Sequence, residues 1–320
     1  MPVVTSPIPK VSLGALRAMG NLAGTLFPRC ANPGCVTGWM HLWRSRQVPI
    51  FEGKWTCSAE CMEALVAAAV RREMDGIAAA RPLRPHRVPM GLMLVRQGTI
   101  TAGQLHRALD EQRRAGGEAG EARKLGEWLI ESGVLSEPAL TRVLSLQWNC
   151  PVFSLDAFQP VEMGPVLPRF LADTCGALPL RSRGGKVLYL AFAGRIDRSL
   201  SYAVERMTGL QVAAGILQDS EFRQACERYS ATVAPSAQYL EAASSWALVR
   251  TIVRRIETGR AAESRLVRVH DTFWLRVWRR AQTEPAWPPP AGVEDLLATV
   301  GGAASSKDHI SDWREMPGRR

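Results

Sequence analysis

Four of the seven cysteines stand in two short pairs near the start of the chain, at a spacing typical of a metal site. Cys30 and Cys35 form the first pair and Cys57 and Cys61 the second, with 21 residues between the pairs. Four thiolates complete the tetrahedral shell of a structural Zn²⁺ ion and leave no position open for a substrate. The sequence therefore predicts a structural zinc site. The alternative is four unligated thiols in a small core.

The residues around these cysteines indicate how the pairs are brought together. Asn32-Pro33-Gly34 can turn the chain between the first two ligands. Segments 39–43 and 48–55 are expected to pair as a hairpin, and Ser58 can begin the helix that carries Cys61. A knuckle, a hairpin and a helix in this order resemble a treble-clef zinc finger.

The other candidates for chemistry are isolated. Cys150, Cys175 and Cys226 lie singly in apolar surroundings and are expected to be buried. Three histidines have no partner pattern and are assigned no chemistry: His86, His106 and His270. The phosphate-cradling motif G-x4-G-K-[ST] does not occur, because the Gly-Lys pairs at 53–54 and 185–186 lack the rest of it. We therefore expect a protein that is not an enzyme.

An internal repeat occupies the region after the cysteines. Residues 89–112 match residues 124–147 at a constant offset of 35, without gaps inside the unit. The matched pairs include Gly91 with Gly126, Leu94 with Leu129, Gly98 with Gly133, Leu105 with Leu140, Leu109 with Leu144, and Gln112 with Gln147. So many matches in order predict a duplicated structural unit.

Each unit reads as two helices. In the first copy a helix over 92–97 ends at Gly98, which can adopt the left-handed backbone of a helix C-terminus. Thr101 stands three residues before Gln104, the spacing of a capping box that begins the second helix. The second copy repeats this pattern, with its first helix over 127–132.

From residue 151 the hydrophobic period changes to that of an α+β layer. The expected strands are 152–155, 177–181, 186–193 and 212–217. The expected helices are 168–175, 197–208 and 220–229. The whole chain is therefore predicted to be an α+β multidomain protein, with a small four-cysteine zinc finger, a duplicated helical-hairpin subdomain, a sandwich-like α+β subdomain and a C-terminal helix plus hairpin.

The repeat resembles the MshEN-type domain, the N-terminal region of type II secretion and type IV pilus ATPases (GspE/PulE/PilB-like). The shared pattern continues beyond the repeat, in Pro151-Val152-Phe153-Ser154-Leu155, in Leu178-Pro179-Leu180 and in Thr208-Gly209-Leu210-Gln211-Val212. The resemblance covers about 140 residues, over roughly 88–230. It implies the family's fold for this region, in a chain where no ATPase motor is expected.

In that family the two repeats together bind cyclic di-GMP. The resemblance therefore implies a nucleotide site at Gly91, Leu94, Gly98, Leu105, Leu109, Gln112, Lys124, Leu125, Gly126, Leu129, Gly133, Leu140, Leu144 and Gln147. Glycines let backbone N–H groups approach phosphate, leucines offer an apolar bed for guanine, and glutamines can bond its edge.

The repeats depart from the family at their first residue. The family begins each unit with Arg-Leu-Gly, whereas this chain has Pro89-Met90-Gly91 and Lys124-Leu125-Gly126. Arginine pairs bidentately with phosphate, and neither replacement does. Arg87 or Arg123 can substitute from nearby. The alternative function is a protein-interaction scaffold that keeps the fold and has lost the nucleotide.

The C-terminal region carries a cluster of basic residues. A helix over 237–258 and a hairpin of 265–270 with 273–279 are expected there. Arg276, interleaved with Trp274 and Trp278, allows a third function, a nucleic-acid-binding zinc protein. The preferred interpretation is a strand with one apolar face and one solvated basic face, which makes nucleic acid an unlikely partner.

Composition sets the remaining limits. The chain has 40 Lys and Arg against 30 Asp and Glu, a net charge of +10, which permits an anionic partner. No apolar run reaches the length of a membrane span, and the N-terminus is a poor signal peptide. We therefore expect a cytoplasmic regulatory or adaptor protein whose partners belong to pilus or secretion machinery.

These observations divide the chain into seven parts. They are a disordered N-terminus 1–28, a four-cysteine zinc-finger-like domain 29–80, a linker 81–88, the duplicated helical subdomain 89–150, the α+β subdomain 151–232, a helix plus β-hairpin 237–282, and a disordered tail 283–320.

Overall fold

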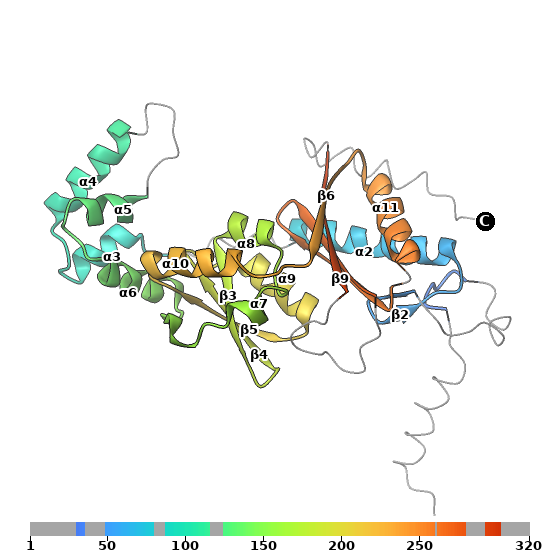
Figure 1. The fold of residues 1–320 in the computed structure, drawn as a ribbon. Helices are drawn as coiled ribbons and strands as arrows, with labels where there is room; N and C mark the ends of the chain where they lie inside the picture. Colours follow the sequence, from blue (N-terminus) through green and yellow to red (C-terminus); the bar gives the residue numbers. More distant parts are fainter. Residues whose placement is uncertain are drawn as a thin grey trace, which may run out of the picture.

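The computed structural model describes residues 30–35, 49–79, 87–115, 124–259, 261–279 and 292–301. The predictions for the first 28 residues, for 39–43 and for most of the linker fall outside these ranges. Three parts follow one another in space: the helical repeats, a central α+β unit, and a four-stranded sheet with two long helices (Figure 1). No helix among the described residues is long and apolar enough to cross a membrane.

The two repeats fold as predicted, each as a short helix followed by a longer one. The four helices are α3 (Met90–Arg96), α4 (Ala102–Ala115), α5 (Leu125–Glu131) and α6 (Glu137–Trp148). The capping box is confirmed, because the Thr101 backbone N–H donates to Gln104 Oε1 at 2.7 Å and the Gln104 N–H donates to Thr101 Oγ1 at 3.2 Å. Gly98 and Gly133 have φ of 69° and 68°, the left-handed turn that glycine permits.

The repeats pack across one another, α3 against α6 and α4 against α5. Their common core is made by equivalent residues of the two copies: Leu94 and Leu129, Ile100 and Leu135, Ala108 and Val143. Gly91 and Gly126 are buried where each short helix meets the following helix. A Cβ at Gly91 would lie 2.7 Å from Leu105, and a Cβ at Gly126 would lie 2.7 Å from Leu140.

Alanine at Gly91 is therefore expected to lose the gain of about 1 kcal/mol that alanine brings elsewhere in a helix, because the Cδ atoms of Leu105 must shift to make room. Gly103→Ala is the matched control, because nothing lies within 4 Å of a Cβ at that helical position. We expect it to stabilise the helix slightly. Urea unfolding of both variants checks this, and equal effects would contradict the packing argument.

The central unit holds a three-stranded sheet in the order β3-β4-β5, with β3 antiparallel and β5 parallel to β4. The strands are β3 (Ala177–Arg183), β4 (Val187–Phe192) and β5 (Gln211–Ile216). The helices are α7 (Pro160–Met163), α8 (Arg169–Cys175), α9 (Arg198–Thr208) and α10 (Asp219–Ser230), with the 3₁₀ turn η2 (Leu155–Ala157). The expected strand at 152–155 is reduced to one bridge, Val152 with Ile216.

The C-terminal sheet corrects two predictions. Its order is β6-β9-β8-β7, from β6 (Ser236–Ala242), β7 (Glu263–Val269), β8 (Thr272–Trp278) and β9 (Val293–Val300). Residues 237–242 therefore form a strand, and only α11 (Ser245–Thr258) is the expected helix. The tail expected to be disordered from 283 contains β9, which pairs with both β6 and β8. The region 237–282 is thus incomplete as a unit without β9.

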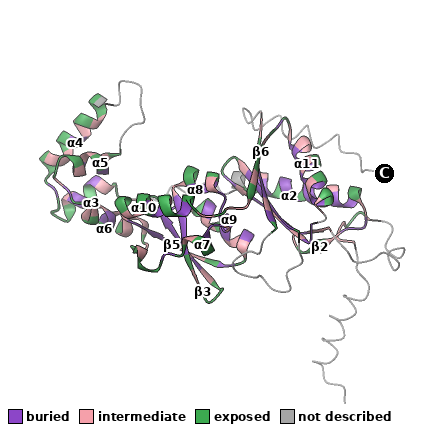
Figure 2. Cartoon of the chain, in the orientation of Figure 1, coloured by how far each residue is buried: buried purple, intermediate pink, exposed green. Residues whose placement is uncertain are grey.

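This sheet is covered on both faces, so side chains that alternate along its strands enter different cores. One face packs on the central unit through Val267, Val269, Trp274, Trp278, Val293 and Leu297. The other face packs on α2 (Ala59–Ala79) and α11 through Leu266, Phe273, Leu275, Val277, Leu296 and Ala298. Figure 2 shows the buried residues concentrated in these strands and in the central sheet.

The cysteine-bearing region is part of the same unit. The long helix α2 lies against α11, and it places Val66 and Val70 in one core with Leu248 and Ile252. The short hairpin of β1 (Ile50–Phe51) and β2 (Lys54–Trp55) reaches β7, where the Glu52 N–H donates to the Ser264 carbonyl at 2.7 Å. The separate zinc-finger domain expected over 29–80 is therefore corrected, since it shares its core with the C-terminal sheet.

Burial also corrects the prediction of a solvated basic face on β8. Arg276 is 1% exposed and forms an ion pair at 2.7 Å with Asp295, which is equally buried. Trp274 Nε1 donates to the same carboxylate at 2.8 Å. Arg276 and Trp274 are therefore inaccessible to nucleic acid. The alternation of arginine and tryptophan along β8 no longer supports a nucleic-acid-binding protein.

Candidate functional site

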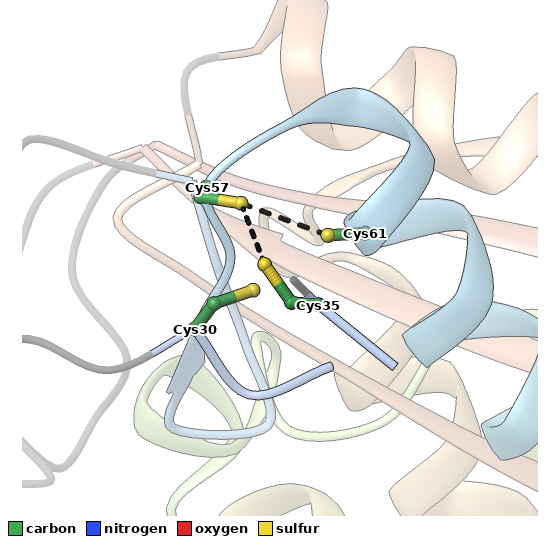
Figure 3. Close-up of side chains that lie close together, drawn as sticks. All are labelled: Cys30, Cys35, Cys57 and Cys61. Atoms are coloured by element: carbon green, nitrogen blue, oxygen red, sulfur yellow. Dashed lines mark hydrogen bonds between the residues drawn. The ribbon is translucent and has the colours of Figure 1, made fainter. Parts of the chain in front are cut away.

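The four paired cysteines converge on one point. Their Sγ atoms all lie within 4.8 Å of one another, with Cys35 at 3.5 Å and Cys61 at 3.6 Å from Cys57 (Figure 3). Four sulfurs around a Zn²⁺ ion with bonds of about 2.3 Å stand about 3.8 Å apart. The cluster can therefore hold a metal ion with small adjustments of the side chains.

Local structure fixes each cysteine as the sequence predicted. Asn32 Oδ1 accepts from the Gly34 N–H at 3.0 Å, and this turn separates Cys30 from Cys35. Ser58 Oγ accepts from the Cys61 N–H at 3.3 Å at the start of α2. The hairpin between the pairs joins 50–51 to 54–55, within the segment 48–55 that was expected to pair with 39–43. That expected pairing lies outside the described residues, whereas the turn before Cys35 and the helix start at Ser58 are as predicted.

An ionic network joins this region to the central unit. Arg206 of α9 contacts Glu73 of α2 at 2.6 Å and Glu52 of the hairpin at 3.7 Å. Arg72 contacts Glu52 at 2.6 Å and Glu73 at 3.0 Å. Hydrogen bonds to Glu52 and Glu73 outweigh the effect of burial and raise the pKa of Arg72. Displacement of the hairpin would therefore disturb the ion pairs that Arg206 of α9 forms.

The structure divides the predicted nucleotide-site residues into two groups. Leu94 and Leu129 are fully buried in the repeat core, so neither is exposed to a ligand in this conformation. Gly91 and Gly126 contact leucines of their own repeat, and Gly98 and Gly133 serve as turn residues. Packing and turn geometry therefore account for these six positions without a ligand.

The other predicted positions have some exposure. They are Leu105, Leu109, Gln112, Lys124, Leu125, Leu140, Leu144 and Gln147. Gln147 Nε2 donates to the Val88 carbonyl at 2.9 Å, which fixes the segment that enters the first repeat against the end of the second. Leu144 packs at the boundary with the central unit, 3.7 Å from a Cβ placed at Gly194.

A basic corner at this boundary contains residues that the repeat pattern did not assign. The Arg87 guanidinium lies over the Trp148 ring, 3.4 Å from its centroid. Burial lowers the pKa of Arg87, and the charges of Arg198 and Arg195 lower it further. We call Arg87, Arg195 and Arg198 the junction arginines. Three like charges close enough to interact favour the approach of an anion.

The cysteines outside the paired cluster differ in their neighbours. Burial raises the pKa of Cys226 to about 11, and Asp173 and Asp219 add to the shift. Burial raises the pKa of Cys175 to about 12, with further contributions from Asp197. Cys175 also lies within 4.8 Å of donor atoms on Asp197 and His270. His270, which was assigned no chemistry for want of a partner pattern, therefore has a partner in the fold, Asp197.

The comparisons with known proteins place part of the chain in the class predicted from the repeat. No protein-family model matches the chain. Close to half of it is nevertheless related in sequence to type IV pilus assembly ATPases, so the resemblance is confirmed.

Two relatives are type IV pilus assembly ATPases named PilB. The protein from Myxococcus xanthus is 29% identical over 151 residues, which is 46% of this chain and 25% of the relative. The protein from Thermus thermophilus is 30% identical over 126 residues, 38% of this chain and 13% of the relative. The chain therefore spans a quarter or less of the length of these relatives.

Two solved structures are also similar. The structure of MshE with cdg is 27% identical and covers 45% of this chain and 99% of that chain, with a TM-score of 0.37. The N-terminal domain of XpsE is 19% identical and covers 44% of this chain and 92% of that chain, with a TM-score of 0.32.

Proposed function

We propose that this chain is a non-catalytic regulatory or adaptor protein whose duplicated helical hairpins bind cyclic di-GMP. One observation carries the proposal: the two hairpins pack side by side around one core built from equivalent residues, Leu94 with Leu129, Ile100 with Leu135 and Ala108 with Val143. Cyclic di-GMP has two guanines and two phosphates on one ring, so a duplicated surface can offer each half the same groups. The relation to pilus ATPases supports this ligand, and it makes pilus or secretion machinery the proposed partner.

The charge at the junction supports an anionic ligand. The family's repeat-initial arginines are absent here, and Lys124 alone keeps a charge at the start of a unit. The junction arginines Arg87, Arg195 and Arg198 supply guanidinium groups where the repeats meet the central unit. A bound phosphate would relieve their mutual repulsion and accept charge-assisted hydrogen bonds. Arg87 is therefore our candidate for the missing arginine.

Ligand binding would regulate by favouring one arrangement of the two repeats over another. The repeats meet through small cores, whereas the central unit and the C-terminal sheet share large ones. A change in the repeats can therefore occur without disrupting the rest of the fold.

A protein-interaction scaffold without ligand is the second candidate. It is favoured by the packing of Gly91 and Gly126, because helix contact alone explains both glycines. In this function the repeats would present a surface to another protein.

We further propose that the four paired cysteines hold a structural Zn²⁺ ion. The sulfur separations of 3.5 Å and 3.6 Å and the treble-clef-like order of knuckle, hairpin and helix support this ion. Four thiolates would close the coordination shell, so the ion would stabilise the fold without taking part in a reaction.

Calorimetric titration with cyclic di-GMP tests the nucleotide proposal. We expect binding by the unaltered chain and a dissociation constant raised about tenfold or more in Arg87→Ala, the effect of losing one charge-assisted bond. Arg107→Ala is the matched control, because Arg107 is an exposed arginine on α4 and is expected to leave affinity unchanged. Absence of heat with the unaltered chain would reject the nucleotide and leave the interaction scaffold.

A further inference from the structure

A second group of metal-ligating side chains lies where the central unit meets the C-terminal sheet. Cys175 ends α8, Asp197 immediately precedes α9, and His270 stands in the turn between β7 and β8. One donor atom from each residue lies within 4.8 Å of the others. We propose that these three side chains bind a divalent transition-metal ion, which ties the two units together.

The fold fixes the carboxylate of this group. Asp197 is the N-cap of α9, and its Oδ1 accepts from the Leu200 N–H at 3.1 Å. Its Oδ2 is directed at His270 Nε2, at 2.5 Å. The cap therefore uses one carboxylate oxygen and leaves the other facing the imidazole and the thiol.

The backbone fixes the imidazole. His270 has φ of 52°, a left-handed conformation that is uncommon for a residue other than glycine. Arg268 Nε donates to the His270 carbonyl at 2.7 Å and holds the turn. The two-residue loop between β7 and β8 needs a positive φ, so the hairpin itself sets this conformation. The turn places the imidazole at the N-terminus of α9.

The donor set is that of a borderline metal ion. A thiolate, an imidazole nitrogen and a carboxylate oxygen are ligands of Zn²⁺ and Co²⁺, and three protein ligands leave a fourth position for water or a partner's side chain. Bonds of about 2.0–2.2 Å would place the nitrogen and oxygen roughly 3.4 Å apart. His270 must therefore withdraw by roughly 1 Å, and its side chain is 55% exposed, so little packing resists the movement.

An ion would also change the state of the thiol. Cys175 is half-buried beside a carboxylate, so its thiol keeps its proton in the absence of a cation. A divalent ion would displace that proton and supply the charge that stabilises the thiolate.

The structure offers substitutions that remove each ligand and keep the local fold. Asp197→Asn preserves the N-cap, because asparagine caps as well as aspartate. His270→Asn preserves the turn, because asparagine tolerates positive φ. Cys175→Ser keeps the size of the side chain. Cys226→Ser is the matched control, since Cys226 is half-buried in the same unit and lies outside the group.

Titration of the chelator-treated full chain with Co²⁺ tests this site through the absorption of thiolate-bound cobalt. We expect two ions per chain for the unaltered protein and for Cys226→Ser, and one ion for Cys175→Ser, Asp197→Asn and His270→Asn. The difference in absorption between the unaltered chain and Cys175→Ser separates this site from the four-cysteine cluster: the lost ion should show the spectrum of a single thiolate ligand.

One ion per chain in the unaltered protein, or equal stoichiometry in Cys175→Ser, would overturn the second site. The interaction of Asp197 with His270 would then be a hydrogen-bonded ion pair only. That outcome would leave the four-cysteine site intact, because the remaining ion would keep the absorption of four thiolate ligands.

Discussion

Replacement of Asp295 by alanine is expected to lower the free energy of unfolding by about 3–5 kcal/mol. The reason is the charge that the substitution leaves behind. Arg276 is 1% exposed, and its Nε and one terminal nitrogen donate to Asp295 at 2.8 Å and 2.7 Å. Its other terminal nitrogen donates to the Val166 carbonyl at 3.0 Å. Without Asp295 the guanidinium stays buried with one neutral acceptor.

Urea unfolding followed by tryptophan fluorescence measures this effect, because Trp274 donates to the same carboxylate. Glu294→Ala is the control on the same strand, since Glu294 forms ion pairs with Arg255 and Arg279 near the surface. We expect it to cost under about 1 kcal/mol. The double replacement Arg276→Met with Asp295→Leu should recover much of the loss, because it removes both charges. Equal effects of the Asp295 and Glu294 variants would contradict the buried-pair argument.

The parts of the fold that were predicted correctly depend on short-range signals. Gly98 and Gly133 end helices because few other residues adopt positive φ, and Thr101 caps α4 through Gln104 three residues later. Repeated local patterns of this kind identify the helical hairpins without knowledge of their surroundings.

Long-range pairing decided the parts that were predicted wrongly. Residues 236–242 contain good helix formers, yet they form β6 because β9, more than fifty residues later, pairs with them. Arg276 was expected to lie on the solvated basic face of its strand. Its partner Asp295 lies on β9, in a region whose composition indicated a disordered tail.

The candidate sites show the same distinction. The four-cysteine cluster has a spacing signature, because its ligands lie within one short stretch of chain. Cys175, Asp197 and His270 come from three separate elements, so no spacing in the sequence predicts that they lie together. Arg87 was named from the sequence as a substitute arginine, but its contact with Trp148 is seen only in the folded arrangement.

Loss of the proposed zinc ion is expected to destabilise the C-terminal sheet as well as the cysteine knuckle. Apparent binding free energies of structural zinc in small peptides are about 10–16 kcal/mol, so the ion can outweigh every other contact of a short hairpin. Cys61 lies in the first turn of α2. The same helix contributes Met62, Val66 and Val70 to the core under that sheet. Release of the first turn of α2 therefore exposes apolar residues of α11 and β7.

Cys57→Ser should accordingly lower the free energy of unfolding by more than about 4 kcal/mol, a range that loss of a metal reaches and most substitutions do not. Scanning calorimetry measures it, and limited proteolysis should show cleavage in α2 and in the sheet together. Cys226→Ser, at a half-buried thiol far from the cluster in sequence, should change stability by only about 1 kcal/mol. If Cys57→Ser and Cys226→Ser have the same free energy of unfolding, the cysteine knuckle contributes no more to stability than an ordinary turn. If α2 alone becomes labile, the shared core does not couple the knuckle to the sheet.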